Sequence, residues 1–158
     1  QHGSLQNLYH KLMKQIDQDI SFIREIKEIN PQTEIIIYIY SPVPTEGSDL
    51  YRKVQASGFH FPEKLEDWIG PQWERFDLRK NPLTPWLTTE MVDKIRNFET
   101  VLNGYYPTVS DIRLNRFRRK FIQFVAGLRY RTSFYQYPYE IKLLHKLWKY
   151  RQPEIQGF

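Results

Sequence analysis

Cysteine is absent from this chain of 158 residues. The chain therefore forms no disulfide, offers no thiol nucleophile and supplies no thiolate ligand to zinc or to an iron–sulfur cluster. A glycine-rich phosphate loop and a serine nucleophile elbow are missing too. The four histidines are scattered without a metal-binding spacing, so we expect neither a metal site nor a catalytic group that the sequence alone identifies.

Long apolar runs are also missing. No stretch approaches the roughly 20 apolar residues that span a bilayer, and the opening QHGSLQNLYHK lacks the apolar centre of a signal peptide. We therefore expect a soluble, cytoplasmic protein without a membrane partner. Residues 1–4 resemble a vector remnant and are left out of the fold prediction.

Aromatic residues and positive charge are what the chain has in excess. Aromatic residues make up 16% of the sequence, which indicates a folded protein with a real core. The formal net charge of +5 permits attraction to nucleic acid or to acidic surfaces without requiring either.

The first third of the chain reads as helix, strand and helix. Residues 5–29 place apolar side chains three or four apart, which predicts a long amphipathic helix that Asn30-Pro31 ends. Residues 34–40 are β-branched and aromatic on both faces, as in a buried strand of a parallel sheet. Ser48 then caps a short helix. One such strand cannot make a sheet by itself, so we expect the chain to be part of something larger.

The remainder is predicted to be aromatic-rich and then helical. Residues 59–87 form an ordered, proline-punctuated wrap with large side chains at Phe59, Phe61, Trp68, Trp73, Phe76 and Trp86. One helix runs from Thr88 or Thr89 to Asn103-Gly104, and another begins at Ser110-Asp111. A last helix begins near Pro138. The helix after Asp111 has one side made of Phe117, Phe121, Phe124, Val125 and Leu128.

Four consecutive pieces of the chain carry a family resemblance: DISFIREIKEINPQTE, IIIYIY, SPVPTEGSDLY and KVQASGFHFPEKLEDW. Together they resemble the carboxyl-terminal part of radical S-adenosylmethionine (radical SAM) enzymes of the cobalamin-binding-domain subclass. In that family a helix ending in Asn-Pro leads to the last barrel strand and a Pro-x-Pro turn, which Pro42-Val43-Pro44 and Leu50-Tyr51 match. Residues 45–48 stand where the family has Gly-Thr, so the turn here is longer by about two residues.

The resemblance implies a fragment of a larger enzyme. The family's CxxxCxxC motif, whose thiolates hold a [4Fe–4S] cluster, lies far upstream in such enzymes and cannot be present in this cysteine-free chain. The parent would therefore hold the cluster, S-adenosylmethionine and, in this subclass, cobalamin. In the family the end of the last strand offers backbone groups to the adenine of S-adenosylmethionine, which here implies Ile39, Tyr40 and Ser41.

The expected fold is thus a predominantly helical α/β fragment. Residues 5–58 would form the last βα unit of a partial parallel β/α barrel, and residues 59–158 the aromatic wrap and a helical C-terminal extension that closes the substrate side. The expected partners are the remainder of the parent enzyme, a small-molecule or peptide substrate, and another copy through the exposed strand.

A second interpretation is a stand-alone helical module whose basic face binds RNA or an acidic protein. The sequence RLNRFRRK gathers Arg113, Arg116, Arg118, Arg119 and Lys120 next to several tyrosines, as a phosphate-tracking surface does. A solvated helix face explains the same charges, so nucleic acid is not the partner that we favour.

Overall fold

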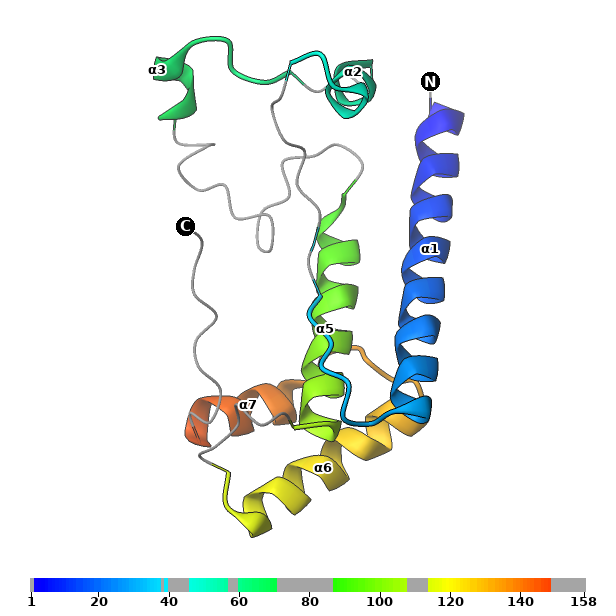
Figure 1. The fold of residues 1–158 in the computed structure, drawn as a ribbon, viewed down its shortest axis with the longest axis vertical. Coiled ribbons are helices and arrows are strands. Elements are labelled where there is room, and N and C mark those ends of the chain that lie inside the picture. Colours follow the sequence, from blue (N-terminus) through cyan, green and yellow to red (C-terminus); the bar gives the residue numbers. More distant parts are fainter. Residues whose placement is uncertain are drawn as a thin grey trace. The chain divides into compact units, whose positions relative to one another are not determined.

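The computed structural model describes residues 2–37, 39, 46–56, 60–70, 87–107 and 114–148. The chain divides into two compact units, one formed by residues 1–11 with 38–92 and the other by residues 12–37 with 93–158. Helices α1 (His2–Ile29) and α5 (Thr89–Tyr105) contribute residues to both units. Each unit is described separately below, and Figure 1 traces the order of the elements.

The first unit contains α2 (Asp49–Ala56) and α3 (Leu65–Trp68). The Ser48 hydroxyl accepts a hydrogen bond from the Tyr51 N–H at 3.1 Å, so the predicted cap of α2 is confirmed. The Tyr51, Phe61 and Trp68 rings stack with centroids 5.2 and 6.5 Å apart. Two residues of the predicted aromatic wrap therefore do pack together. Its other large side chains, Phe59, Trp73, Phe76 and Trp86, lie outside the described residues.

The second unit is built from the later turns of α1 and α5 together with α6 (Arg116–Arg131) and α7 (Tyr139–Trp148). Figure 1 shows these parts of α1 and α5 side by side, with α6 crossing near their C-terminal ends. Asp17 of α1 and Lys94 of α5 form an ion pair at 2.6 Å. The core of this unit consists of Ile20, Phe98, Val101, Leu102, Leu114, Ile122, Ala126, Tyr130 and Ile141.

Several helix boundaries agree with the sequence prediction. Helix α1 ends at Ile29, directly before Asn30-Pro31. The Thr88 hydroxyl accepts from the Met91 N–H at 3.3 Å at the start of α5, as predicted. Helix α5 nevertheless continues through Gly104 to Tyr105 instead of ending at Asn103-Gly104. Gly104 is thus the last residue but one of α5, and an added Cβ there would clash with Ala126 of α6.

The predicted strand and barrel unit are wrong. Residues 33–37 and 39 carry no regular structure, and no strand occurs anywhere in the ranges that the structure describes. A strand needs a neighbour for its backbone hydrogen bonds, and the helices around this segment have already used their own backbone groups. Ile35 and Ile37 pack against the helical core, whereas Ile36 is 70% exposed. The segment keeps the side-chain alternation of an extended chain without the sheet.

The predicted apolar side of α6 is mostly exposed: Val125 packs partly buried against the core, whereas Phe117, Phe121, Phe124 and Leu128 face solvent. The buried residues of α6 are Ile122, Ala126, Gly127 and Tyr130. A Cβ added to Gly127 would lie 2.9 Å from the Tyr105 ring, which shows how closely α5 approaches α6 here. Small residues are needed for such an approach, so bulk alone did not decide which face is buried.

Candidate functional site: the exposed face of helix α6

The first turns of α6 concentrate the basic residues of the second unit. The Asn115 side chain accepts from the Arg118 N–H at 2.8 Å and so caps the helix. The predicted start at Ser110-Asp111 lies outside the described residues. Helix α6 contains six arginines and lysines and no aspartate or glutamate. Four of the six lie in its first five residues, near the positive end of the helix dipole, where cations are unfavourable. Helix stability therefore does not explain this placement.

Large apolar side chains face solvent on the same helix. Phe117, Phe121, Phe124 and Leu128 are 78%, 45%, 67% and 55% exposed. At 3.6 residues per turn these four side chains fall within an arc of about 60°. The buried Ile122 and Ala126 lie on the opposite side of the helix. We call these four residues the phenylalanine face of α6.

Basic and aromatic groups of α7 and α6 meet at one edge of this face. The Arg118 guanidinium lies over the Trp148 ring, 5.5 Å from its centroid. The Phe121 and Trp148 rings meet edge to face with centroids 6.2 Å apart. These contacts fix the orientation of Arg118 and Phe121, so part of the surface is already organised. The surface offers apolar contact and positive charge along three turns of one helix.

The structure describes four of the five residues of the predicted basic patch. Arg116, Arg118, Arg119 and Lys120 are all exposed on α6, while Arg113 lies outside the described residues. Of the three predicted adenine contacts, the structure describes Ile39. Ile39 is half-buried, and Tyr40 and Ser41 lie outside the described residues. The phenylalanine face was visible in the sequence as a pattern, but nothing in the sequence indicated that it is open.

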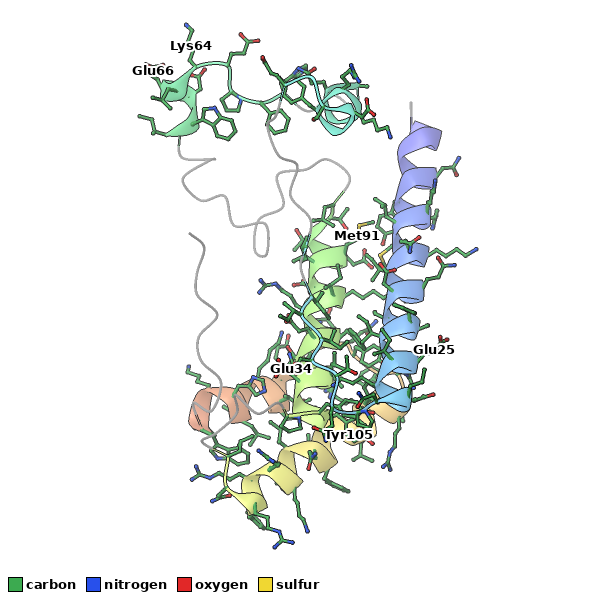
Figure 2. All side chains as sticks on the ribbon, viewed as in Figure 1. Glu25, Glu34, Lys64, Glu66, Met91 and Tyr105 are labelled. Atoms are coloured by element: carbon green, nitrogen blue, oxygen red, sulfur yellow. The ribbon has the colours of Figure 1, made fainter. Side chains whose placement is uncertain are left out.

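A cleft of about 950 Å³ lies beside the C-terminal ends of α1 and α5. Figure 2 labels Tyr105 at the end of α5 and Glu34 on the segment after α1, and both line this tyrosine cleft. Arg119 and Gln123 of α6 line it as well. The Tyr105 ring rests against Gly127, where a side chain would not fit. Sequence reasoning missed this cleft, because its wall comes from three separate segments.

Lys27 is the buried charge at the base of the tyrosine cleft, with 4% of its surface exposed. Its ammonium donates to the carbonyl oxygens of Pro31, at 3.1 Å, and of Thr33. It also lies 4.7 Å from the centroid of the Tyr106 ring. Burial lowers the pKa of Lys27, and the nearby Glu34 carboxylate opposes that shift. Lys27 thereby fastens the segment after α1 to the end of that helix.

Three tyrosines pack next to Lys27. The Tyr130 ring lies 5.0 Å from Tyr105 and 5.5 Å from Tyr106, measured between centroids. The Arg24 guanidinium lies 4.9 Å from the Tyr130 centroid. Burial raises the pKa of Tyr130 and of Tyr106. The two hydroxyls influence each other's pKa, but the buried Tyr130 hydroxyl has no hydrogen-bond partner at ordinary geometry.

Among the described residues, no group of three histidine, aspartate or glutamate side chains is placed to hold a metal ion. Within the same residues, no helix is both long and apolar enough to cross a membrane. Comparison of the chain with protein-family models, curated sequences and solved structures gives no match. The function of the chain is therefore inferred from its own residues, and chiefly from the phenylalanine face.

Proposed function

We propose that this chain is the C-terminal helical part of a radical SAM enzyme of the cobalamin-binding-domain subclass, and that it is catalytically incomplete by itself. It docks on the remainder of the enzyme and covers its substrate side. The observation that carries this proposal is the phenylalanine face of α6, which stays open although the second unit has its own core. The proposal places the chain in the cytoplasm.

The exposed apolar side chains of α6 are unfavourable in water. Burying one phenylalanine or leucine side chain is worth about 1.5–3 kcal/mol, and single-domain proteins rarely leave large contiguous apolar patches in water. Phe117 and Phe124 have most of their surface in water and lie two helical turns apart on one line. A surface of this kind is stabilised when another part of the same enzyme covers it.

The segment after α1 supports the same interpretation. Residues 33–37 are extended and place Ile36, which is 70% exposed, away from the core of the second unit. Helix α1 ends before Asn30-Pro31 and Ser48 caps α2, as in the family that the sequence resembles, whereas the segment between them lacks the family's strand in its described residues. This exposed segment is a second surface for the remainder of the enzyme or for another copy of the chain.

The chemistry of the proposed parent enzyme lies outside this chain. Three thiolates hold the [4Fe–4S] cluster that cleaves S-adenosylmethionine in radical SAM enzymes, and a chain without cysteine cannot supply them. The described residues thus do not fit the cluster, and no catalytic step is assigned to them. Their part is to dock and to shape the substrate side, for a small-molecule or peptide substrate.

The test begins with the reading frame upstream of this chain, where we expect a CxxxCxxC motif. The upstream part and this chain are then produced separately and mixed under anaerobic conditions with iron, sulfide and S-adenosylmethionine. We expect cleavage of S-adenosylmethionine by the mixture at a higher rate than by the upstream part alone, and none by this chain. An upstream frame without the motif, or cluster formation by this chain alone, contradicts the proposal.

A second candidate is a stand-alone basic module, which the absence of acidic residues in α6 favours. Such a module binds RNA or an acidic protein, and its affinity falls steeply as salt rises. The Arg116→Glu, Arg119→Glu double variant reverses two exposed charges. A salt-dependent RNA complex that this variant abolishes, found together with a start codon at the beginning of the chain, favours this candidate over the first.

A further inference from the structure

The spacing of the phenylalanine face indicates what kind of surface covers it. Phe117, Phe121, Phe124 and Leu128 follow one another at intervals of four, three and four residues. This is the spacing of a helix that packs along a second helix, with each side chain inserting between residues of the partner. The four residues cover about 17 Å along the helix axis at 1.5 Å per residue.

The width of the face argues for a partner helix. An apolar arc of about 60° is narrower than the arc of about 100° or more that a helix presents to a broad core. A bilayer surface also takes up a wide apolar face. A narrow apolar strip over three turns is typical of a helix that packs along one other helix. The described part of α6 already uses its opposite side for the core of the second unit.

The charges beside the phenylalanine face indicate the sign of the charge that the partner helix carries. Arg118 and Lys120 flank the phenylalanine face on its two sides, at the positions from which coiled-coil helices make interhelical ion pairs. Neither forms a salt bridge within the described residues, and α6 has no acidic residue that would compensate them. A second copy of α6 would bring like charges together, which disfavours self-association through this face.

We propose that the phenylalanine face of α6 binds an acidic amphipathic helix, with apolar residues at alternating three- and four-residue spacing and glutamate or aspartate on both sides. This inference rests on the proposed function, in which the helix belongs to the remainder of the enzyme. It explains the unfavourable placement of Arg118 and Lys120 at the start of α6, because a carboxylate-rich partner stabilises them there.

A designed peptide tests the recognition directly. The probe is a fluorescent helical peptide of about three heptads with leucine at the apolar a and d positions of each heptad and glutamate at the flanking e and g positions. Two comparison peptides have the same composition in scrambled order, and lysine in place of glutamate. Anisotropy titrations with the full 158-residue chain should show saturable binding of the first peptide, on the order of tenfold or more tighter than either comparison peptide.

Two variants locate the binding surface. Phe117→Ser with Phe124→Ser should weaken binding on the order of 30-fold, because interface affinity concentrates in buried aromatic side chains. The matched control, Leu65→Ser with Ile69→Ser, removes side chains that are 80% and 78% exposed on α3 and directly after it, and should leave binding unchanged. The substituted side chains are exposed, so circular dichroism should show the wild-type helix content and melting temperature in both variants.

A charge reversal tests the flanks. Arg118→Glu with Lys120→Glu should weaken binding of the glutamate peptide and strengthen binding of the lysine peptide. Lys11→Glu with Lys14→Glu makes the same net change in charge on α1 and should not change which peptide binds more tightly. Equal binding of designed and scrambled peptides overturns the inference. So does preferential binding of a short RNA or of phosphatidylglycerol vesicles, or a dimer that the Phe117→Ser, Phe124→Ser variant dissociates.

The two proposals fail in different ways. Peptide binding does not depend on what lies upstream, so a missing CxxxCxxC motif contradicts the radical SAM parent and leaves the recognition of acidic helices standing. Conversely, a motif upstream combined with no peptide selectivity contradicts this inference and leaves the proposed function standing.

Discussion

A Cβ atom added to Gly104 in α5 would lie 2.9 Å from the Cβ of Ala126 in α6. Real Cβ atoms essentially never come that close to another heavy atom. The two helices therefore meet here at the closest distance that their backbones allow, and both residues are buried. This contact decides which side of α6 faces the core, and so it also decides that the phenylalanine face stays open.

Gly104→Ala should destabilise the second unit. Alanine favours a helix over glycine by roughly 1 kcal/mol, but the overpacked contact costs about 1–3 kcal/mol, and Ala126 cannot move aside as a long side chain could. We expect a lower urea midpoint with an unchanged slope. Gln18→Ala, at an exposed position of α1, gains helix propensity without a clash and should not lower the midpoint. A Gly104→Ala chain at least as stable as wild type would contradict the close approach.

Lys27→Met should lower the free energy of unfolding by about 1–2 kcal/mol, because two carbonyl oxygens lose their buried donor. Lys14→Met, at an exposed position of the same helix, should have little effect. Burial lowers the pKa of Lys27, so the unfolded chain binds the proton more tightly than the folded chain. The pH-dependent part of its contribution is complete above the ordinary pKa of 10.5 and is lost as pH falls through the lowered value, whereas the hydrogen bonds to the two carbonyl oxygens remain. Denaturation curves should thus show that the free energy of unfolding of wild type increases relative to that of Lys27→Met as pH rises toward 10.5.

Tyr130→Phe should cost less stability than Tyr135→Phe. The buried Tyr130 hydroxyl interacts with the Tyr106 hydroxyl but forms no hydrogen bond of ordinary geometry, so its removal should change the free energy of unfolding by less than about 1 kcal/mol. The Tyr135 hydroxyl accepts from an Arg24 nitrogen at 3.0 Å, and its removal should cost about 1 kcal/mol. Thermal unfolding of the two variants measures the difference. A larger loss for Tyr130→Phe would mean that its hydroxyl is satisfied in solution.

Arg129 connects α6 to the start of α7 and should be important for stability. Its guanidinium donates to the Gln136 carbonyl at 2.7 Å, to the Tyr137 carbonyl at 3.2 Å and to both carboxylate oxygens of Glu140. Tyr137 has a positive φ of 49°, which is uncommon for a residue with a side chain and needs such support. Arg129→Met should cost about 2–3 kcal/mol in urea unfolding. Arg131→Met, at the exposed neighbouring position, should be close to neutral.

The Arg129–Glu140 ion pair also gives a pH dependence. Burial is the largest single influence and pushes the pKa of Glu140 up, but the Arg129 hydrogen bond, a backbone hydrogen bond of Glu140 itself and the Arg129 charge together hold the pKa below the ordinary 4.5. The stabilisation is therefore complete above pH 4.5 and is lost as pH falls through the lowered pKa. Wild type and Glu140→Gln should differ most near neutral pH and converge in acid. A difference that persists unchanged in acid would show that charge is not the cause.

The local sequence was sufficient for helices, because caps and periodic apolar residues act within a few residues. Ser48 and Thr88 cap helices as predicted, and Asn30-Pro31 ends α1. The same local logic failed for residues 34–40, because a strand exists only with a neighbour, and the sequence of one segment does not say whether the neighbour is present.

The candidate site could be predicted only in part. The basic residues of α6 and the four residues of its phenylalanine face are visible as a pattern in the sequence. That pattern usually marks a buried face, and here the buried face belongs to the less apolar residues around Ala126 and Gly127. The tyrosine cleft was not predictable, since its residues come from α5, α6 and the segment after α1.

The sequence by itself determined the end of α1 and the starts of α2 and α5, that no thiolate chemistry occurs in this chain, and that α6 is basic with one aromatic side. Those properties depend on composition and on neighbours within one or two turns. Only the tertiary structure decided which side of α6 is buried. At the contact of Gly104 with Ala126 the two helix backbones come close together, so the side of α6 with small residues packs against α5 and the side with large residues does not. The same contact leaves Phe117 and Phe124 in water, where a partner can reach them.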